Sequence, residues 1–292
     1  MTKNVVSREH YVPRCYLKRF TADGRRIYGI REGRSGILPL NIDDVCVEGD
    51  LYETLWRNPA MGEKFVLRND LEKRLERMED RFSKALDAVL DPRARASRHR
   101  VEDEDKLALA MLAANLVLRN PRYMPNFVNE PVDAGTRAEL DLIREDAEAE
   151  CAKRGWLLDF GALVEAGEKR GLLVLDDGRA PHAAVARAVY GMDLAILEAP
   201  SDHLFVTSSF PVLASTEPDD AGIETPVSLY IPLSSRYAAL FSPAGEGYAD
   251  QTIRGDDVEK FNSCYLPANN PFVEWILAES EEALARLSSD LS

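Results

Sequence analysis

Three groups of residues have types and spacings that could support chemistry. His10 stands in His10-Tyr11-Val12-Pro13, and an imidazole there could act as a general base or could bond a loop carbonyl. Asn115 and Arg119 are four residues apart in the most apolar stretch of the chain, so they share one face of the expected helix. Burying an arginine without a partner is costly, so Arg119 should pair with a carboxylate or line a pocket that holds an anion.

These two alternatives for Arg119 predict different surroundings. In the first, Arg119 forms a buried ion pair, and Asp193 and Asp202 are the candidate partners because they flank strand-like segments. In the second, Arg14 and Arg119 approach one cavity that binds a phosphorylated or otherwise anionic ligand, with His10 at its wall.

A run of hydroxyl residues forms the third group. Thr207, Ser208 and Ser209 end an expected strand, where their hydroxyls could bind a phosphate or cap a turn. The chain has no Gly-rich phosphate loop, dinucleotide fingerprint, zinc-protease motif or nucleophile elbow, so no cofactor can be named.

The cysteines and the apolar segments indicate the cellular compartment in which the protein works. Cys15, Cys46, Cys151 and Cys264 form no C-x-x-C pair, which predicts no metal site and favours reduced packing residues of a cytoplasmic protein. Residues 1–10 lack the apolar stretch of a signal peptide, and Leu107 to Leu118 is too short to cross a bilayer. We therefore expect no membrane association.

Charge separates the N-terminal segment from the rest of the chain. The 292 residues contain 36 Lys and Arg against 50 Asp and Glu, a net charge of −14 that disfavours nucleic acid as a partner. Residues 1–40 contain nine Lys and Arg but three Asp and Glu. This basic segment could contact phosphates, nucleic acid included, or it could pack against the acidic body.

The middle of the chain is expected to be helical. Asn69 is a plausible N-cap for an amphipathic helix that begins at about residue 70 and ends near Asp91-Pro92. A second helix from about Val101 to Arg119 is apolar on all sides, which predicts that it lies inside a bundle. A third, acidic helix should turn Leu140, Ile143, Ala147 and Cys151 inward and end at Gly155.

The C-terminal part mixes strands and helices. Strands are expected at 192–197, 203–207, 228–232 and 236–242, and helices at 183–190, 256–264 and 281–287. Helices grouped in one region and strands in another predict an α+β fold with a mixed, mainly antiparallel C-terminal part. We expect residues 1–292 to form a single compact domain with a basic α/β segment (1–60), a helical block (61–170) and a mainly β part (171–292).

Several short motifs occur in the order typical of one bacterial family. They lie at His10 to Phe20, Val45 to Tyr52, Asn115 to Pro121, Phe205 to Val212 and Ile231 to Ser234. On these motifs the chain resembles domain of unknown function family 4238, for which the resemblance implies no reaction. The family pattern has an aspartate where this chain has Ser209, which favours a non-catalytic role for this chain.

Two functions follow from these observations. The first is binding of a phosphorylated or anionic ligand by Arg14, Asn115, Arg119 and the hydroxyls of residues 207–209, with phosphoester hydrolysis if His10 acts as base. The alternative is a non-catalytic interaction or binding module, with a protein partner and a defence or toxin-like role as options. The first requires these residues to converge on one cavity, whereas the second predicts an exposed apolar patch.

Overall fold

The structure is a computed structural model that describes residues 8–58, 62–66, 69–96, 101–125, 134–155, 157–173, 181–218, 224–245 and 249–288. All the candidate site residues lie in these ranges, whereas His99 of an arginine-rich run lies outside them. The helices are α1 (Arg14–Leu17), the 3-10 turn η1 (Lys18–Phe20), α2 (Asp70–Val89), α3 (Pro92–Ala96), α4 (Asp103–Leu118), α6 (Ala134–Lys153), α7 (Phe160–Leu173), α8 (Pro181–Tyr190), α9 (Gly255–Ser263) and α10 (Glu281–Ser288).

Strands account for the other part of this α+β fold. They are β1 (Arg8–His10), β2 (Arg26–Arg31), β3 (Leu38–Asn41), β4 (Val47–Gly49), β5 (Thr54–Asn58), β6 (Gly62–Val66), β7 (Asp193–Glu198), β8 (Thr207–Ser208), β9 (Leu213–Pro218), β10 (Glu224–Pro232), β11 (Tyr237–Ser242), β12 (Gln251–Thr252) and β13 (Trp275–Ala278). The α+β class expected from the sequence is confirmed.

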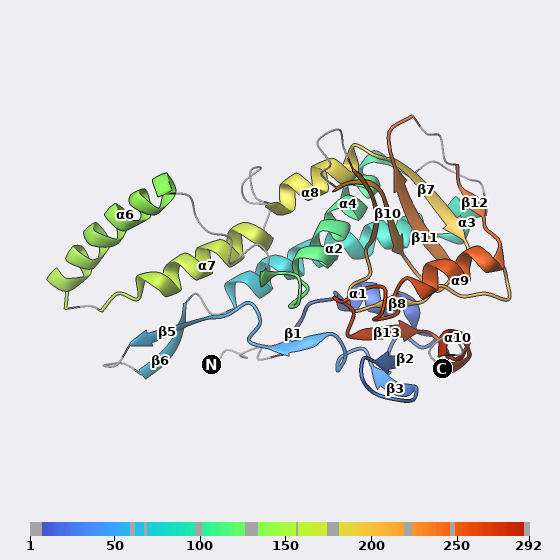
Figure 1. Ribbon diagram of the computed structural model, residues 1–292, viewed down its shortest axis with the longest axis horizontal. Coiled ribbons are helices and arrows are strands. Elements are labelled where there is room, and N and C mark those ends of the chain that lie inside the picture. The colour runs from blue at the N-terminus through green and yellow to red at the C-terminus, as the bar shows by residue number, and fades with distance from the viewer. Residues whose placement is uncertain are drawn as a thin grey trace.

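Helices α2, α4 and α8 form the centre of the molecule (Figure 1). Helix α4 packs against both α2 and α8, and its Leu109, Leu112 and Leu116 are almost fully buried. The apolar residues on all its sides explain this central place, because each side meets a neighbour. Helix α2 begins and ends as predicted, but Asn69 takes a left-handed conformation with φ of 60° and makes no side-chain cap bond.

Two sheets lie beside this helical centre. One has the order β12-β7-β11-β10-β9, antiparallel except for the parallel pair β12–β7, with β12 and β9 as its edge strands. The other has the order β3-β2-β13-β8 and pairs β2 of the N-terminal part with β13 near the C-terminus. The first and last thirds of the chain are thus joined by one sheet.

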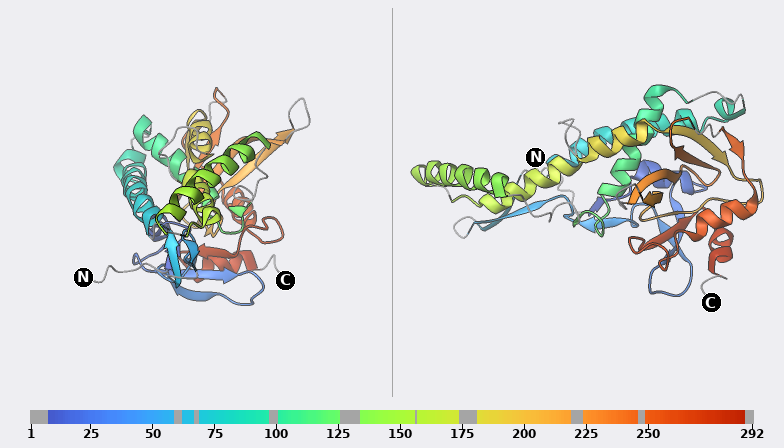
Figure 2. Two further views of the ribbon diagram at one scale, coloured as in Figure 1. Left: turned by 90° about the vertical axis from the view of Figure 1, so that its left-hand side faces the viewer. Right: turned by 45° about the horizontal axis from the view of Figure 1, so that its top comes forward.

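Helices α6 and α7 extend from the body together with the hairpin β5–β6 (Figure 2). Helix α7 packs against β5, α2 and α8. Ile143 of α6 is 56% exposed, so the prediction that it points inward is wrong. Within the part of the chain that the structure describes, no helix is long and apolar enough to cross a membrane.

Some expected strands differ from the structure. Of the strand predicted at 203–207, only Thr207 is part of a strand, because residues 203–206 bond to loop carbonyls and to Asn262 instead of a neighbouring strand. Strands β9 and β13 were not expected. The sequence of β9, with Ser215, Thr216 and Pro218, has weak strand periodicity, and pairing with β10 overrides it. The division of the chain into three subregions stays a prediction.

Candidate functional site

Arg119 follows the last residue of α4, and its side chain is fully buried. Its Nη1 donates to Glu79 Oε1 at 2.8 Å and to Asn115 Oδ1 at 3.1 Å. Its Nε donates to the Tyr52 hydroxyl at 2.7 Å, and its Nη2 donates to the backbone carbonyl of His10. A guanidinium has five N–H groups, so four of them are used within the chain.

The carboxylate partner of Arg119 is therefore Glu79, and the expectation of Asp193 or Asp202 is wrong. Helices α2 and α4 pack together, and this contact brings Glu79 to the end of α4. Asp193 instead accepts a hydrogen bond from the Gly245 backbone N–H at 2.7 Å, and Asp202 lies against His203.

Tyr52 links Arg119 to the N-terminal segment. Its hydroxyl accepts from Arg119 and donates to the His10 carbonyl at 2.9 Å, and its ring lies under the guanidinium with Cζ 5.2 Å from the ring centroid. The His10 ring bonds the Ile42 carbonyl at 3.0 Å through Nε2. Burial lowers the pKa of His10, and the charges of Arg14 and Arg119 lower it further.

The Arg14 side chain lies at the surface, whereas Asn115 is buried. The Arg14 side chain is 62% exposed and forms an ion pair with Asp43 at 3.2 Å. Asn115 is fully buried; its Oδ1 accepts from Arg119, while its Nδ2 has no hydrogen-bond partner. The structure thus brings His10, Asn115 and Arg119 together and leaves the Arg14 head group at the surface.

The hydroxyls of residues 207–209 are all buried and bonded within the fold. Thr207 Oγ1 meets the Tyr16 hydroxyl at 2.8 Å, and Ser208 Oγ accepts from the Phe210 N–H at 3.1 Å. Ser209 Oγ accepts from the N–H groups of Glu274 and Trp275 at 2.7 and 3.1 Å. The Ser208 bond closes a turn and the Ser209 bonds cap the start of β13, whereas Thr207 bonds another side chain. An aspartate at position 209 could accept the same two bonds, so the residue change preserves an acceptor.

Buried carboxylates near Tyr52 were not expected from the sequence. Glu9 is fully buried, with Oε2 accepting from the Tyr52 N–H at 2.8 Å and Oε1 without a hydrogen-bond partner. Burial raises the pKa of Glu9 to about 7, and the carboxylates of Glu72, Glu53 and Asp50 add to this shift. The signal that the sequence offered was the place of Glu9 two residues before the buried segment Tyr11 to Pro13.

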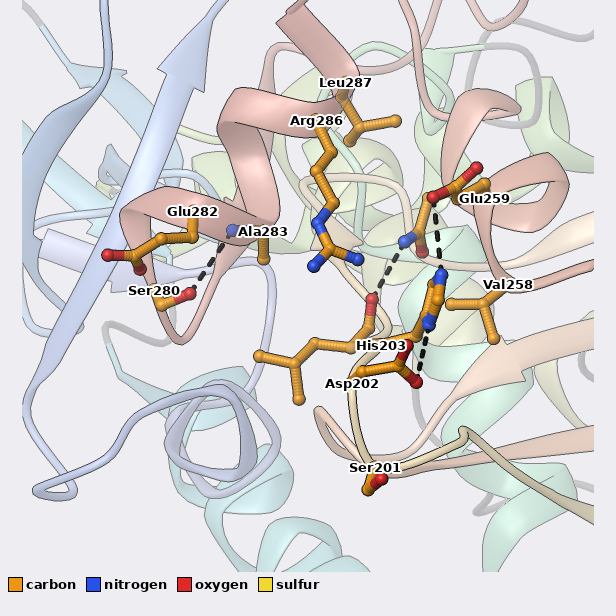
Figure 3. Close-up of a pocket in the computed structure, with 12 residues that line it drawn as sticks. Ser201, Asp202, His203, Val258, Glu259, Ser280, Glu282, Ala283, Arg286 and Leu287 are labelled. Atoms are coloured by element: carbon orange, nitrogen blue, oxygen red, sulfur yellow. Dashed lines mark hydrogen bonds and ion pairs between the residues drawn. The ribbon is translucent and has the colours of Figure 1, made fainter. Parts of the chain in front are cut away.

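A polar cavity of about 480 Å³ lies between α9, α10 and the loop before β8 (Figure 3). His203 stands in its wall, with Nδ1 3.0 Å from Asp202 Oδ1 and Nε2 3.4 Å from Glu259 Oε1. The Arg286 side chain reaches into the cavity opposite His203. The cavity therefore has an imidazole and a guanidinium on facing walls.

Two residues shape this polar cavity. Asn262 fixes the loop before β8, since its Oδ1 accepts from the Val206 N–H and its Nδ2 donates to the Leu204 carbonyl. Gly255 begins α9 beside the His203 ring, and a Cβ there would lie 2.4 Å from two ring atoms. Only glycine lets the helix start this close to the imidazole.

A second cavity, of about 700 Å³, lies between α4, α8, the start of β9 and residues 264–272; we name it the apolar groove. Its lining consists of aliphatic and aromatic side chains with Cys264, Asn269 and Asn270, and contains no Asp, Glu, Lys, Arg or His. Neither His10 nor Arg119 lines this groove or the polar cavity.

Three aromatic rings form one wall of the apolar groove. The ring centroids of Tyr123, Phe210 and Phe272 lie 4.9–5.4 Å from one another. Asn120 fixes this wall, because its Oδ1 accepts from the Tyr123 N–H and its Nδ2 donates to the Ser209 carbonyl at 2.9 Å. The end of α4 thus positions both the Arg119 network and the aromatic wall.

The described residues contain no group of three or more His, Cys, Asp or Glu side chains arranged to hold a metal ion. The four cysteines are free thiols, of which Cys264 is exposed.

The model of a family described as "Protein of unknown function (DUF4238)" matches residues 8–282, so the chain belongs to this family. No curated protein and no solved structure matches the chain.

Proposed function

We propose that this protein is a binding module whose apolar groove takes an apolar ligand or side chain. The observation that carries this proposal is the groove itself: about 700 Å³ lined without a charged residue, in a chain of which 29% is charged. Cavities of this size, mainly apolar with a few polar groups, are the usual form of ligand sites. The large apolar residues that line the groove are buried or half-buried, so the groove is a cavity and the exposed apolar patch of the non-catalytic alternative stays a prediction.

The groove lies where the helical centre meets the five-stranded sheet. Val117 and Leu118 of α4 and Val185 of α8 form one side, and Leu213 of β9 and Leu229 of β10 form the other. The buried core of the described residues consists of two hydrophobic clusters, one that includes Leu112 and one that includes Phe210, and Val117 packs against both. A ligand there would contact elements from distant parts of the chain, so its binding would also stabilise their packing.

The surroundings of Arg119 give less support to an anion site there. Four of its five N–H groups already bond protein oxygens, and Glu79 balances its charge. Arg14, the second expected cation, pairs with Asp43 at the surface. Anion binding by Arg14, Asn115, Arg119 and residues 207–209 stays a prediction.

The test uses N-phenyl-1-naphthylamine, an uncharged dye that fluoresces in apolar surroundings. We expect saturable binding by the wild-type protein. Ala188 is an exposed residue that lines the groove from α8, so Ala188→Trp should fill the groove and weaken dye binding at least tenfold. Ala152→Trp on the exposed side of α6 is the matched control and should bind as wild type does. Absence of saturable binding, or unchanged binding by Ala188→Trp, contradicts the proposal.

A second candidate function is acid–base catalysis in the polar cavity, including phosphoester hydrolysis. The specific observation is His203 between two carboxylates and opposite Arg286. With Asp202 holding Nδ1, His203 Nε2 would leave its 3.4 Å contact with Glu259 and take a proton from a water whose oxygen attacks phosphorus. The bond to the leaving alcohol oxygen then breaks, that oxygen takes up the proton, and Arg286 binds the phosphoryl oxygens. The net charge of the wall disfavours anions, so this function ranks second.

Hydrolysis of p-nitrophenyl phosphate tests this second candidate. His203→Gln should abolish the activity, while His10→Gln, which changes a ring outside the cavity, should retain it. An absence of activity in the wild-type protein, or equal activity in both variants, removes the candidate.

We also propose that the protein works in a reducing compartment such as the cytoplasm. Support comes from the four free thiols, because disulfides are rare where thiols are kept reduced. Nucleic acid is the less favoured partner, since Arg8, Arg19 and Arg31 of the basic segment pair with Asp44, Asp87 and Glu274.

A further inference from the structure

The edge strand β9 has one unpaired side among the residues that the structure describes. It is the last strand in the order β12-β7-β11-β10-β9 and pairs antiparallel with β10 alone. In such a pair, alternate residues direct their N–H and C=O groups to the neighbour and the others direct them outward. The outer side of β9 therefore offers backbone donors and acceptors in the spacing that another strand requires.

This open edge runs into the apolar groove. Leu213 and Ala214, the first two residues of β9, both line the groove. Ala214 is opposite Leu229 of β10, which lines it as well. A strand added along β9 would thus begin beside the aromatic wall, with every second side chain directed to the groove.

We infer that the apolar groove and the edge of β9 together bind an extended peptide segment of a partner protein, which adds to the sheet as a further strand. This inference rests on the proposed binding function of the groove. Backbone bonds to β9 would supply affinity, and apolar side chains in the groove would supply specificity. The bound segment would be apolar at alternate positions, because the groove has no charged lining residue.

Charge defines the flanks of the bound segment. The protein carries a net charge of −14, so an approaching segment meets an overall negative field. Basic or neutral flanking residues would favour encounter, and acidic ones would oppose it.

A second copy of β9 fits the groove poorly. After Leu213 and Ala214 the strand continues with Ser215 and Thr216, which are exposed and polar. Its alternation therefore supplies no row of apolar side chains for the groove of another molecule. This argues for a different chain as the occupant.

The experiment begins with a displayed library of random ten-residue peptides. Peptides are selected on the wild-type protein and counter-selected on Ala188→Trp. We expect selected peptides with apolar residues at alternate positions and few acidic residues. Replacing single backbone N–H groups of such a peptide by N-methyl groups should weaken binding at least tenfold at alternate positions, because every second amide faces β9.

Hydrogen exchange of the complex provides a readout on the protein. The outward-facing amides among residues 213–217 should gain protection when the peptide binds, while those of β12, at the other edge of the sheet, should not change. A helical peptide, insensitivity to N-methylation at every position, or unchanged exchange in β9 would overturn the inference. Counter-selection on Ala188→Trp that removes no peptides from the library would also overturn the inference.

Two further outcomes distinguish strand addition from binding of a small molecule, and a partner protein from a second copy of this chain. Saturable dye binding without any selected strand-forming peptide would overturn strand addition and leave the groove as a site for small apolar molecules. A dimer that forms without peptide, with protection of β9 in both copies, would overturn the assignment of the partner as another protein.

Discussion

Glu79 Oε1 lies 2.8 Å from Arg119 Nη1, and this ion pair joins α2 to the end of α4. The arginine is fully buried, whereas the Glu79 side chain is 23% exposed. Because Arg119 also holds Tyr52 and the His10 carbonyl, the pair fixes the N-terminal segment on the helical centre.

Arg119→Met should cost about 3–5 kcal/mol of unfolding free energy, because it strands the Glu79 carboxylate and several buried acceptors. Urea unfolding measures the loss. In the double variant with Glu79→Gln, the loss should be smaller than the sum of the two single losses. Sulfate should raise the wild-type Tm no more than chloride at equal ionic strength. A greater rise with sulfate that Arg119→Met abolishes would support the anion site instead.

Glu9→Gln should flatten the pH dependence of stability between about pH 4.5 and 7. The pKa of Glu9 rises from 4.5 to about 7 on folding, so the folded state binds this proton more tightly. Its stabilising effect is complete below pH 4.5 and is lost as the pH rises through 7, by on the order of 3 kcal/mol. Urea unfolding at pH 5 and pH 8 measures this. Glu48→Gln, exposed on the neighbouring β4, should leave the pH dependence unchanged.

Leu112→Ala should cost about 2–5 kcal/mol, because α4 is enclosed and Leu112 has no exposed surface. Leu142→Ala on α6 removes the same atoms from a side chain that is 65% exposed, and it should cost under about 0.5 kcal/mol. Equal urea midpoints for the two variants would place α4 outside the core.

Gly255→Ala should destabilise the protein by about 1–3 kcal/mol, since its Cβ would overlap the His203 ring. The same substitution at Gly167, a glycine of α7 with open space around it, should stabilise by about 0.5–1 kcal/mol. Thermal unfolding compares the two. In a His203→Ala background, Gly255→Ala should no longer destabilise the protein to a large extent. If the destabilisation persists, its cause is the backbone of α9 and not the His203 ring.

Cys264 should be the cysteine that a bound groove ligand protects from alkylation. It is exposed and lines the apolar groove, whereas Cys46 is buried and burial raises the pKa of Cys15 to about 12. Mass spectrometry should find four free thiols and slower iodoacetamide labelling of Cys264 with N-phenyl-1-naphthylamine present. Labelling of Cys151, far along α6, should not change; equal slowing at both would indicate a reagent effect.

The sequence by itself determined the α+β class, the course of α2 and α4, and the burial of Arg119. These features depend on local periodicity and on the cost of an isolated charge, both of which can be read from neighbouring residues. The apolarity of α4 on all sides was sufficient to predict its central place, and Leu109, Leu112 and Leu116 confirm it.

Tertiary structure alone decided which groups meet. Arg119 pairs with Glu79, 40 positions away, and Ser209 bonds the backbone of residues 274 and 275, because packing of distant elements selects among many carboxylates and donors. The apolar groove likewise combines α4, α8, β9 and residues 264–272. Each contributes side chains typical of a core, and only their arrangement leaves a cavity between them, since a cavity is a property of packing and has no local sequence pattern.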